Sequence, residues 1–463
     1  MSLSPLKTNI LPKPPTLRKL IGPSFVILGL GLGSGELILW PYMASKYGMG
    51  IIWGAVIGIT FQFFMNMEIE RYALARGESV FMGFARKLKW LPFWFLISTF
   101  IPWIWPGIIA SSAKLLGSLF GLESTQFLAI GLLVFIGLIL SLGPVLYKTV
   151  EGIQKVIIGL GVPAILVLAI YLASSADWLA AVKGVIGQGD GYWLLPVGVP
   201  LATFLGALAY AGAGGNLNLA QSYYVNNKGY GMGKYSGQIT SLLTGKSQEI
   251  SLSGTKFEPT LENVLTFKDW WKKVNIEHFI IFWLTGAITM VLLSLLAYST
   301  VYETSGSASD INFVLTEGAL IGQKIFPIIG TIFVLTAAVM LMATQMTVFD
   351  ATSRILSENL ILASNGRIAE KSIPKIYYSM LWVQIFAGIL IFLLGFTQPL
   401  QLVITAAVLN AFAMFVHVGL TLWMNLTALD KQLRPNIFRI TMMLSAFIFY
   451  GGFCAYVIFD TIL

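Results

Sequence analysis

The stretch Gly29–Glu36, with the sequence GLGLGSGE, decides how the rest of the chain is interpreted. It places four glycines, a serine and a carboxylic acid inside an apolar run from Ile21 to about Ala44, which is long enough to span a bilayer. A carboxylate near the middle of a membrane costs a few kcal/mol or more, so Glu36 indicates a functional site facing protein or water. Alternate glycines favour a break in the helix that exposes backbone groups, although they could instead form a flat helix-packing face.

A second stretch, Tyr210–Asn218 with the sequence YAGAGGNLN, repeats this pattern. Again a glycine cluster ends on a polar side chain within an apolar segment. Paired, interrupted membrane segments in corresponding positions of two halves are typical of transporters with inverted repeats. The two stretches are about 180 residues apart, which leaves room for a repeat of five helices.

The composition indicates an integral membrane protein and excludes most other classes. The 463 residues are 56% hydrophobic and 11% charged, with a mean hydropathy of +0.79. The single cysteine, Cys454, cannot form a disulfide within the chain, and the two histidines show no metal-ligand spacing. No nucleophile–base pair, phosphate-binding loop or metal motif lies in the polar segments, so we expect neither an enzyme nor a resident cofactor.

Hydropathy predicts an all-α fold with eleven transmembrane helices: two inverted repeats of five helices, in which helices 1 and 6 are broken, and one extra helix. The resulting parts are a tail (1–20), a first repeat (21–175), a second repeat (176–425) with a loop at about 225–275, and the extra helix (426–463). Residues 261–273 of that loop read either as a short surface helix or as part of a mobile linker. The eleven spans are expected at about 21–44, 50–70, 91–119, 126–146, 153–173, 194–224, 278–300, 325–350, 375–396, 400–424 and 438–460. Prolines predict a kink in the third.

The placement of basic residues predicts the orientation. With the N-terminus in the cytoplasm and the C-terminus outside, 25 of the 29 Lys and Arg residues fall on the cytoplasmic side. The net charge of +8 is therefore a topology signal in the plasma or inner membrane, and there is no reason to expect nucleic acid as a partner. The oligomeric state is left open.

A third group of polar residues lies in or after the eighth span. Asp350, Arg354 and Glu358 are spaced i, i+4, i+8, so they share a helix face and can pair. They form either a salt-bridged stripe or a gate. Asn410 and His417, in the tenth span, project to the same side, and the histidine reads as a packing residue or as a ligand.

Several motifs of this sequence resemble those of the Nramp family of divalent-metal/proton symporters, which share the leucine-transporter fold. Gly22–Phe25 followed by Gly33–Glu36 is similar to that family's first-helix pattern, glycine-proline-glycine-phenylalanine then aspartate-proline-glycine-asparagine. The resemblance continues at Ala213–Leu217, at Ala343–Thr347 and at Asn410–Ala413.

The departures from the family pattern fall in its metal site. Where the resemblance places the family's metal-binding aspartate, its metal-binding methionine and its sixth-helix histidine, this chain has Gly33, Ala213 and Gly215, and Glu36 replaces an asparagine. With alanine in place of methionine, the site lacks the methionine thioether, a soft ligand that favours transition metals. The resemblance therefore implies a divergent member of the family.

The candidate substrate site combines both glycine stretches with polar residues of two other spans. Backbone carbonyls and these side chains would make an oxygen-rich site suited to a hard divalent cation, with Glu36 and Asn216 as metal ligands and proton coupling left open. Alternatively, helix N-termini at the breaks would hold the carboxylate of an amino acid or other small organic solute. A non-transporting sensor is a third possibility. The predicted site residues are Gly33, Gly35, Glu36, Ala213, Gly214, Gly215, Asn216, Gln345 and Asn410.

Overall fold

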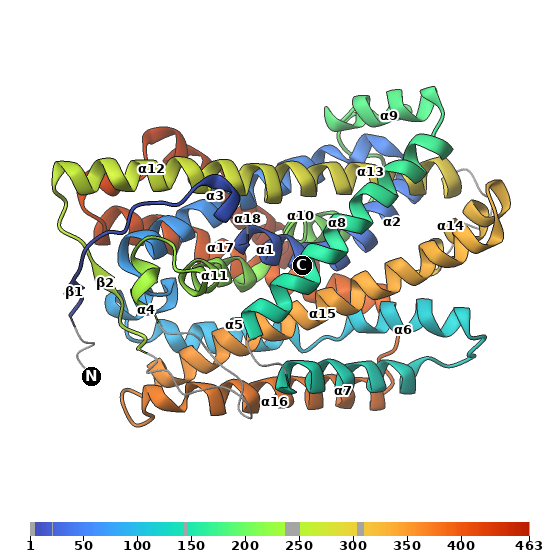
Figure 1. Cartoon of the computed structure of the whole chain (residues 1–463). Helices are drawn as coiled ribbons and strands as arrows, with labels where there is room; N and C mark the ends of the chain where they lie inside the picture. The colour runs from blue at the N-terminus through green and yellow to red at the C-terminus, as the bar shows by residue number, and fades with distance from the viewer. Residues whose placement is uncertain (1–4, 21, 143–145, 237–250, 303–309, 463) are drawn as a thin grey trace.

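The computed structural model describes residues 5–20, 22–142, 146–236, 251–302 and 310–462. Long helices run side by side along one direction, and α15 (Pro327–Ala363) crosses the middle of the bundle (Figure 1). This helix contacts several others and is the element around which they pack; among them are α1 (Pro23–Gly31), α5 (Leu91–Trp103), α6 (Gly107–Leu119), α14 (Asn312–Lys324) and α16 (Ile373–Leu393). Apart from helices, the described residues contain one short parallel pair, β1 (Lys7–Thr8) with β2 (Thr255–Lys256).

Nine helical segments of the described chain are long and apolar enough to cross a membrane. They are Pro23–Tyr47, Met49–Arg76, Leu91–Leu119, Val150–Leu172, Leu261–Val301, Pro327–Ala363, Glu370–Leu393, Pro399–Ala428 and Ile437–Phe459. The fourth expected span is the shorter apolar helix α7 (Gln126–Leu142), and the sixth is an interrupted pair of helices. The chain is a multi-pass membrane protein, whereas the count of eleven spans stays a prediction.

The first span is helical along its whole length, so the predicted break there is wrong. Helix α1 (Pro23–Gly31) continues into the π-helix η2 (Leu32–Leu39) and then into α2 (Trp40–Tyr47). The N–H of Trp40 donates to the carbonyl of Gly35, an i→i+5 bond. The glycines thus allow a wider turn instead of an unwound backbone, and π-bulges within α-helices are frequent at functional sites.

The sixth span is broken, as predicted. Helix α10 (Leu201–Ala209) ends before the non-helical residues Tyr210–Gly214; the 3-10 turn η4 (Gly215–Ala220) and α11 (Gln221–Lys228) follow. Gly214 and Gly215 have φ angles of 76° and 55°, in the left-handed region that glycine adopts without steric cost. We call Tyr210–Asn218 the break segment.

Three other predictions about the helices have clear outcomes. The third span is interrupted at Pro106, between α5 (Leu91–Trp103) and α6 (Gly107–Leu119), which confirms the kink. The expected short surface helix at 261–273 is not a separate element. Instead, α12 (Leu261–His278), the π-helix η6 (Phe279–Leu284) and α13 (Thr285–Val301) form one continuous helix. Its Trp270 is buried and donates to the carbonyl of Pro12 at 2.6 Å, so this part of the helix packs against the N-terminal segment.

The remaining elements complete the bundle and its ends. They are η1 (Leu17–Lys19), η3 (Met49–Ile51), α3 (Trp53–Arg76), α4 (Val80–Lys87), α8 (Leu146–Leu172), α9 (Ser175–Val185), η5 (Gly231–Tyr235), α14 (Asn312–Lys324), η7 (Glu370–Ser372), α16 (Ile373–Leu393), α17 (Pro399–Ala428), η8 (Lys431–Leu433) and α18 (Ile437–Ile462).

Candidate functional site

The π-helix of the first span and the break segment touch backbone to backbone. A Cβ atom built on Gly35 would lie 1.6 Å from the carbonyl oxygen of Tyr210, and one built on Gly31 would lie 2.6 Å from the carbonyl oxygen of Gly212. No side chain larger than hydrogen fits at either position without displacing the break segment. The alternate glycines therefore allow the backbone of the first span to lie directly against the backbone of the break segment.

Helix α3 holds the break segment from a second side through Gln62 and Asn66. The Gln62 side chain donates to the carbonyl of Ala209 at 3.0 Å and accepts from the N–H of Gly214 at 3.2 Å. Asn218 donates its amide hydrogens to the Oδ1 of Asn66 at 2.8 Å and to the Oε1 of Gln62 at 3.0 Å. Backbone groups released by the break are thus bonded to buried amides, as backbone within a membrane requires.

Helices α5 and α17 hold the remaining sides. The amide of Asn216 donates to Ser98 Oγ at 2.9 Å and to Thr99 Oγ1 at 3.0 Å. Asn410 donates to the hydroxyl of Tyr210 at 2.9 Å. A Cβ atom built on Gly215 would lie 1.8 Å from the Oδ1 of Asn410. No side chain at position 215, histidine included, could coexist with Asn410 in this conformation.

His417 also contacts the break segment, with its Nε2 3.0 Å from the carbonyl oxygen of Gly215. This hydrogen bond agrees with the interpretation of His417 as a packing residue. The imidazole ring thereby bonds the carbonyl of the first residue of η4.

Three buried side-chain oxygens around the break segment receive no hydrogen bond within the described chain. They are the Oδ1 atoms of Asn216, Asn218 and Asn410, all in residues that are fully buried. A buried amide oxygen without a donor costs about 1–3 kcal/mol. Three such atoms around one interruption of the backbone are hard, neutral ligands that suit a cation or the N–H groups of a polar solute.

The structure places the other predicted site residues as follows. Gly33 faces the side chain of Thr344, whose hydroxyl donates to the carbonyl of Gly29 at 3.0 Å. Ala213 and Gln345 are buried, the first within the break segment itself.

Glu36 is fully buried and faces Gly286 of α13. A Cβ atom built on Gly286 would lie 3.4 Å from the Oε1 of Glu36. Neither carboxylate oxygen has a hydrogen-bond partner in the described chain, so no hydrogen bond joins Glu36 to Asn216 or Asn410.

The predicted pairing along the eighth span is found for two of the three residues. The Nε of Arg354 donates to both oxygens of Asp350, at 2.9 and 3.0 Å, and the hydroxyl of Tyr377 donates to the same carboxylate at 2.9 Å. Glu358 instead accepts a hydrogen bond from Ser79 at the start of α4. Arg354 and Glu358 line a small cavity of about 70 Å³ together with Tyr223 and Asn226 of α11.

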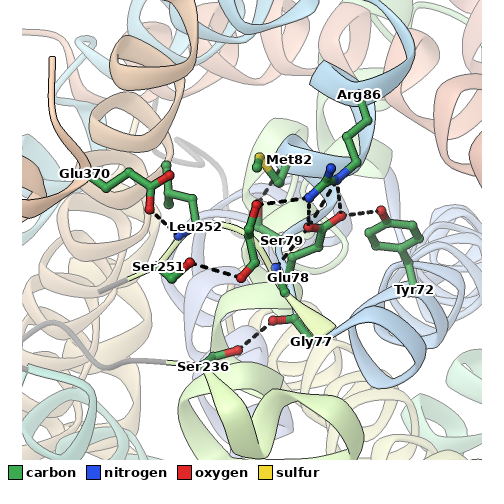
Figure 2. Close-up of polar contacts among 12 residues, drawn as sticks. Tyr72, Gly77, Glu78, Ser79, Met82, Arg86, Ser236, Ser251, Leu252 and Glu370 are labelled. Atoms are coloured by element: carbon green, nitrogen blue, oxygen red, sulfur yellow. Dashed lines mark hydrogen bonds and ion pairs between the residues drawn. The ribbon is translucent and has the colours of Figure 1, made fainter. Parts of the chain in front are cut away.

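Residues 251–256, here called the strap, lie beside this cavity and tie three parts of the chain together (Figure 2). The N–H groups of Gly254 and Leu252 donate to Glu78 at 3.1 Å and to Glu370 at 3.0 Å. Glu78 also accepts from Arg86 at 2.9 Å. Burial alone would lower the pKa of the Arg86 guanidinium, but its hydrogen bonds to Glu78 raise the pKa above its ordinary value, so the guanidinium stays charged.

Sequence reasoning missed the residues that support the break from other helices. Gln62 and Asn66 are spaced i, i+4 in the second span, and polar side chains at that spacing in a membrane helix were a usable signal. Ser98 and Thr99 gave none, since isolated hydroxyls in a membrane helix commonly bond their own backbone.

Comparisons with known proteins place this geometry in a recognisable class of fold. No protein-family model matches the sequence, and no curated protein matches it. Among solved structures, mutants of a manganese transporter from Eremococcus coleocola are similar, with a TM-score of 0.71, 13% identity, and coverage of 99% of this chain and 90% of that chain. MhsT in complex with L-phenylalanine gives a TM-score of 0.55 at 13% identity, covering 94% of this chain and 97% of that chain.

At this identity the likeness shows the fold alone. It confirms the predicted class: an all-α membrane protein with the architecture of the leucine-transporter-like proteins.

Proposed function

We propose that the protein is a secondary transporter that moves a hard cation, such as Mn²⁺ or Mg²⁺, across the membrane by alternating access. The observation that carries the proposal is a set of three buried amide oxygens around the break segment, which have no hydrogen-bond partner among the described residues: those of Asn216, Asn218 and Asn410. Oxygen ligands at a helix interruption suit a hard cation. Ala213 stands where the resemblance places a methionine, and a site without that thioether favours hard over soft cations. A cation with few charged ligands would keep part of its hydration shell.

The close packing of the two spans also favours a small substrate. Gly35 and Gly31 lie directly on the carbonyls of Tyr210 and Gly212, so backbone fills the space between these segments. A cation needs only a small rearrangement to be bound there, whereas an organic molecule needs the two segments to separate.

A second candidate substrate is an amino acid or another small organic solute. Trp103 stacks on Tyr210 with ring centroids 5.5 Å apart, which places an aromatic wall at the break segment. Such a wall commonly lines sites for organic ligands. The structural likeness to MhsT, a protein solved with L-phenylalanine, is compatible with this candidate.

Other features complete the proposal. Glu36, which is buried in the first span without a hydrogen-bond partner among the described residues, would carry a coupled proton. The Asp350–Arg354 pair with Glu358 would act as a gate. The N-terminus would lie in the cytoplasm and the C-terminus outside, in the plasma or inner membrane. The chain would carry no enzymatic activity and no resident cofactor.

Uptake into proteoliposomes tests the proposal. The purified protein would be reconstituted and offered Mn²⁺, Mg²⁺ and Ca²⁺ in one series and radiolabelled amino acids in another, with empty liposomes as the control. Saturable uptake of a divalent cation supports the proposal. Saturable uptake of an amino acid without cation uptake would replace it with the second candidate, and uptake of neither would favour a sensor.

A further inference from the structure

A cavity of about 640 Å³ lies outside the candidate site, between the α4–α5 connection, the α15–α16 connection and the strap. This volume lies in the range of cavities that hold small molecules. Its apolar wall includes Met82, Pro92 and Ile361, and its polar wall includes Arg86 and Lys89. The cavity therefore pairs an apolar surface with basic groups.

The position of the cavity places it at the edge of the membrane. Three candidate spans begin or end at the cavity or one residue from its lining: Glu370 lines it, and Leu91 and Ala363 are next in sequence to residues that do. Beside it, Trp90 and Phe93 are 59% and 62% exposed at the start of the third span. Exposed tryptophans at a span boundary are typical of the headgroup level of a bilayer.

The charged side chains that line the cavity differ in whether they are already bonded to other groups of the protein. Arg86 is bound by Glu78, and its Nη2 also donates to Ser253 of the strap at 3.1 Å. The carboxylate of Glu370 is turned to the N–H of Leu252 (Figure 2). Lys89 is exposed and has no ion-pair partner within the described residues. Its ammonium group is therefore the charge available to a ligand.

We propose that this cavity binds the phosphate group of an anionic phospholipid. Lys89 would contact the phosphate, and the first part of an acyl chain would lie against Pro92 and Ile361. The ammonium group of a lysine that has no ion-pair partner is a compact positive charge that can bind a phosphate group. The apolar wall at headgroup level favours a phosphate that belongs to a lipid. Because the strap forms one wall, an occupied cavity would also stabilise the docked strap.

The matched pair Lys87 and Lys89 provides the test. Both side chains are exposed and belong to the same basic segment, but only Lys89 lines the cavity, whereas Lys87 lies over the ring of Trp423. Retention of phosphatidylglycerol against phosphatidylcholine would be measured by native mass spectrometry for the wild type, Lys89→Gln and Lys87→Gln. We expect Lys89→Gln to lower the preference for phosphatidylglycerol about fivefold and Lys87→Gln to leave it unchanged.

Two further arms complete the test. Ala85→Trp places a large side chain in the cavity and should reduce phosphatidylglycerol retention as Lys89→Gln does, with an unchanged melting temperature in phosphatidylcholine. Inorganic phosphate, titrated without lipid, should not raise the melting temperature. Equal losses in both lysine variants, retention unaffected by either Lys89→Gln or Ala85→Trp, or stabilisation by phosphate alone would each overturn the proposal.

Discussion

Gly35 of the first span lies directly against the carbonyl oxygen of Tyr210, so closely that a Cβ atom on the glycine would be 1.6 Å from that oxygen. This contact joins the π-helix of one span to the break of another. Two segments that depart from regular α-helix therefore pack on each other, and side chains from α3, α5 and α17 hold the second of them in place.

The first prediction concerns this contact. Gly35→Ala should abolish uptake and lower the melting temperature, because overpacking of this kind costs about 1–3 kcal/mol and the displaced atom is backbone. The control is Gly131→Ala in α7, where an added Cβ meets nothing within 4 Å. Fluorescence-detected melting and liposome uptake would be measured for both. Normal uptake by Gly35→Ala would show that the contact is dispensable.

The second prediction concerns Glu36. Since its carboxylate faces Gly286 and has no hydrogen-bond partner in the part of the chain that the structure describes, we expect Glu36→Gln to remove the dependence of uptake on the pH gradient. The substrate KM should change by no more than about threefold, and the melting temperature should not fall. A tenfold rise in KM with intact pH dependence would instead make Glu36 a substrate ligand.

The third prediction concerns topology. In a Cys454→Ala background, Glu262→Cys should react with a membrane-impermeant maleimide only from the cytoplasmic side, and Gln323→Cys only from outside, because basic residues favour the cytoplasm. Both positions are exposed. Labelling of Glu262→Cys in intact cells would reverse the orientation.

The fourth prediction concerns the strap. Glu78→Gln removes the charge that binds Arg86 and the N–H of Gly254, so the amides of residues 251–256 should exchange with deuterium about tenfold faster, as expected for the loss of a charge-assisted hydrogen bond. Glu262→Gln, an exposed acid on α12, is the control. Unchanged exchange in Glu78→Gln would mean that other contacts hold the strap.

Much of the fold could be predicted because hydropathy and glycine clusters are local signals. The break at Gly214 and Gly215 follows from residues that adopt positive φ, and the kink at Pro106 follows from proline. The same local signal failed at Gly33 and Gly35. Alternate glycines permit both an unwound strand and a π-helix, and the choice depends on what packs against them.

The site could be predicted only in part, because its contacts join residues far apart in the sequence. Asn216 and Asn410 were found as polar residues in apolar spans. Ser98, the partner of Asn216, was not found, and nothing in the local sequence links Asn410 to Tyr210. The direction of Glu36 likewise depends on the wider turn of the π-helix, which no sequence pattern specified.

The measurement that tests the central claim most directly is the KM for Mn²⁺ uptake of two opposite substitutions at Asn216. If its Oδ1 binds the transported cation, Asn216→Asp adds a charged ligand of the same shape and should lower the KM, whereas Asn216→Leu should raise it about tenfold or more. Asn275→Asp in α12, where the side chain is hydrogen-bonded to Arg439 and to the carbonyl of Trp271, is the control. Opposite shifts in the two Asn216 variants are the predicted result. An unchanged KM in both, with normal folding, would contradict the assignment of the break segment as the cation site.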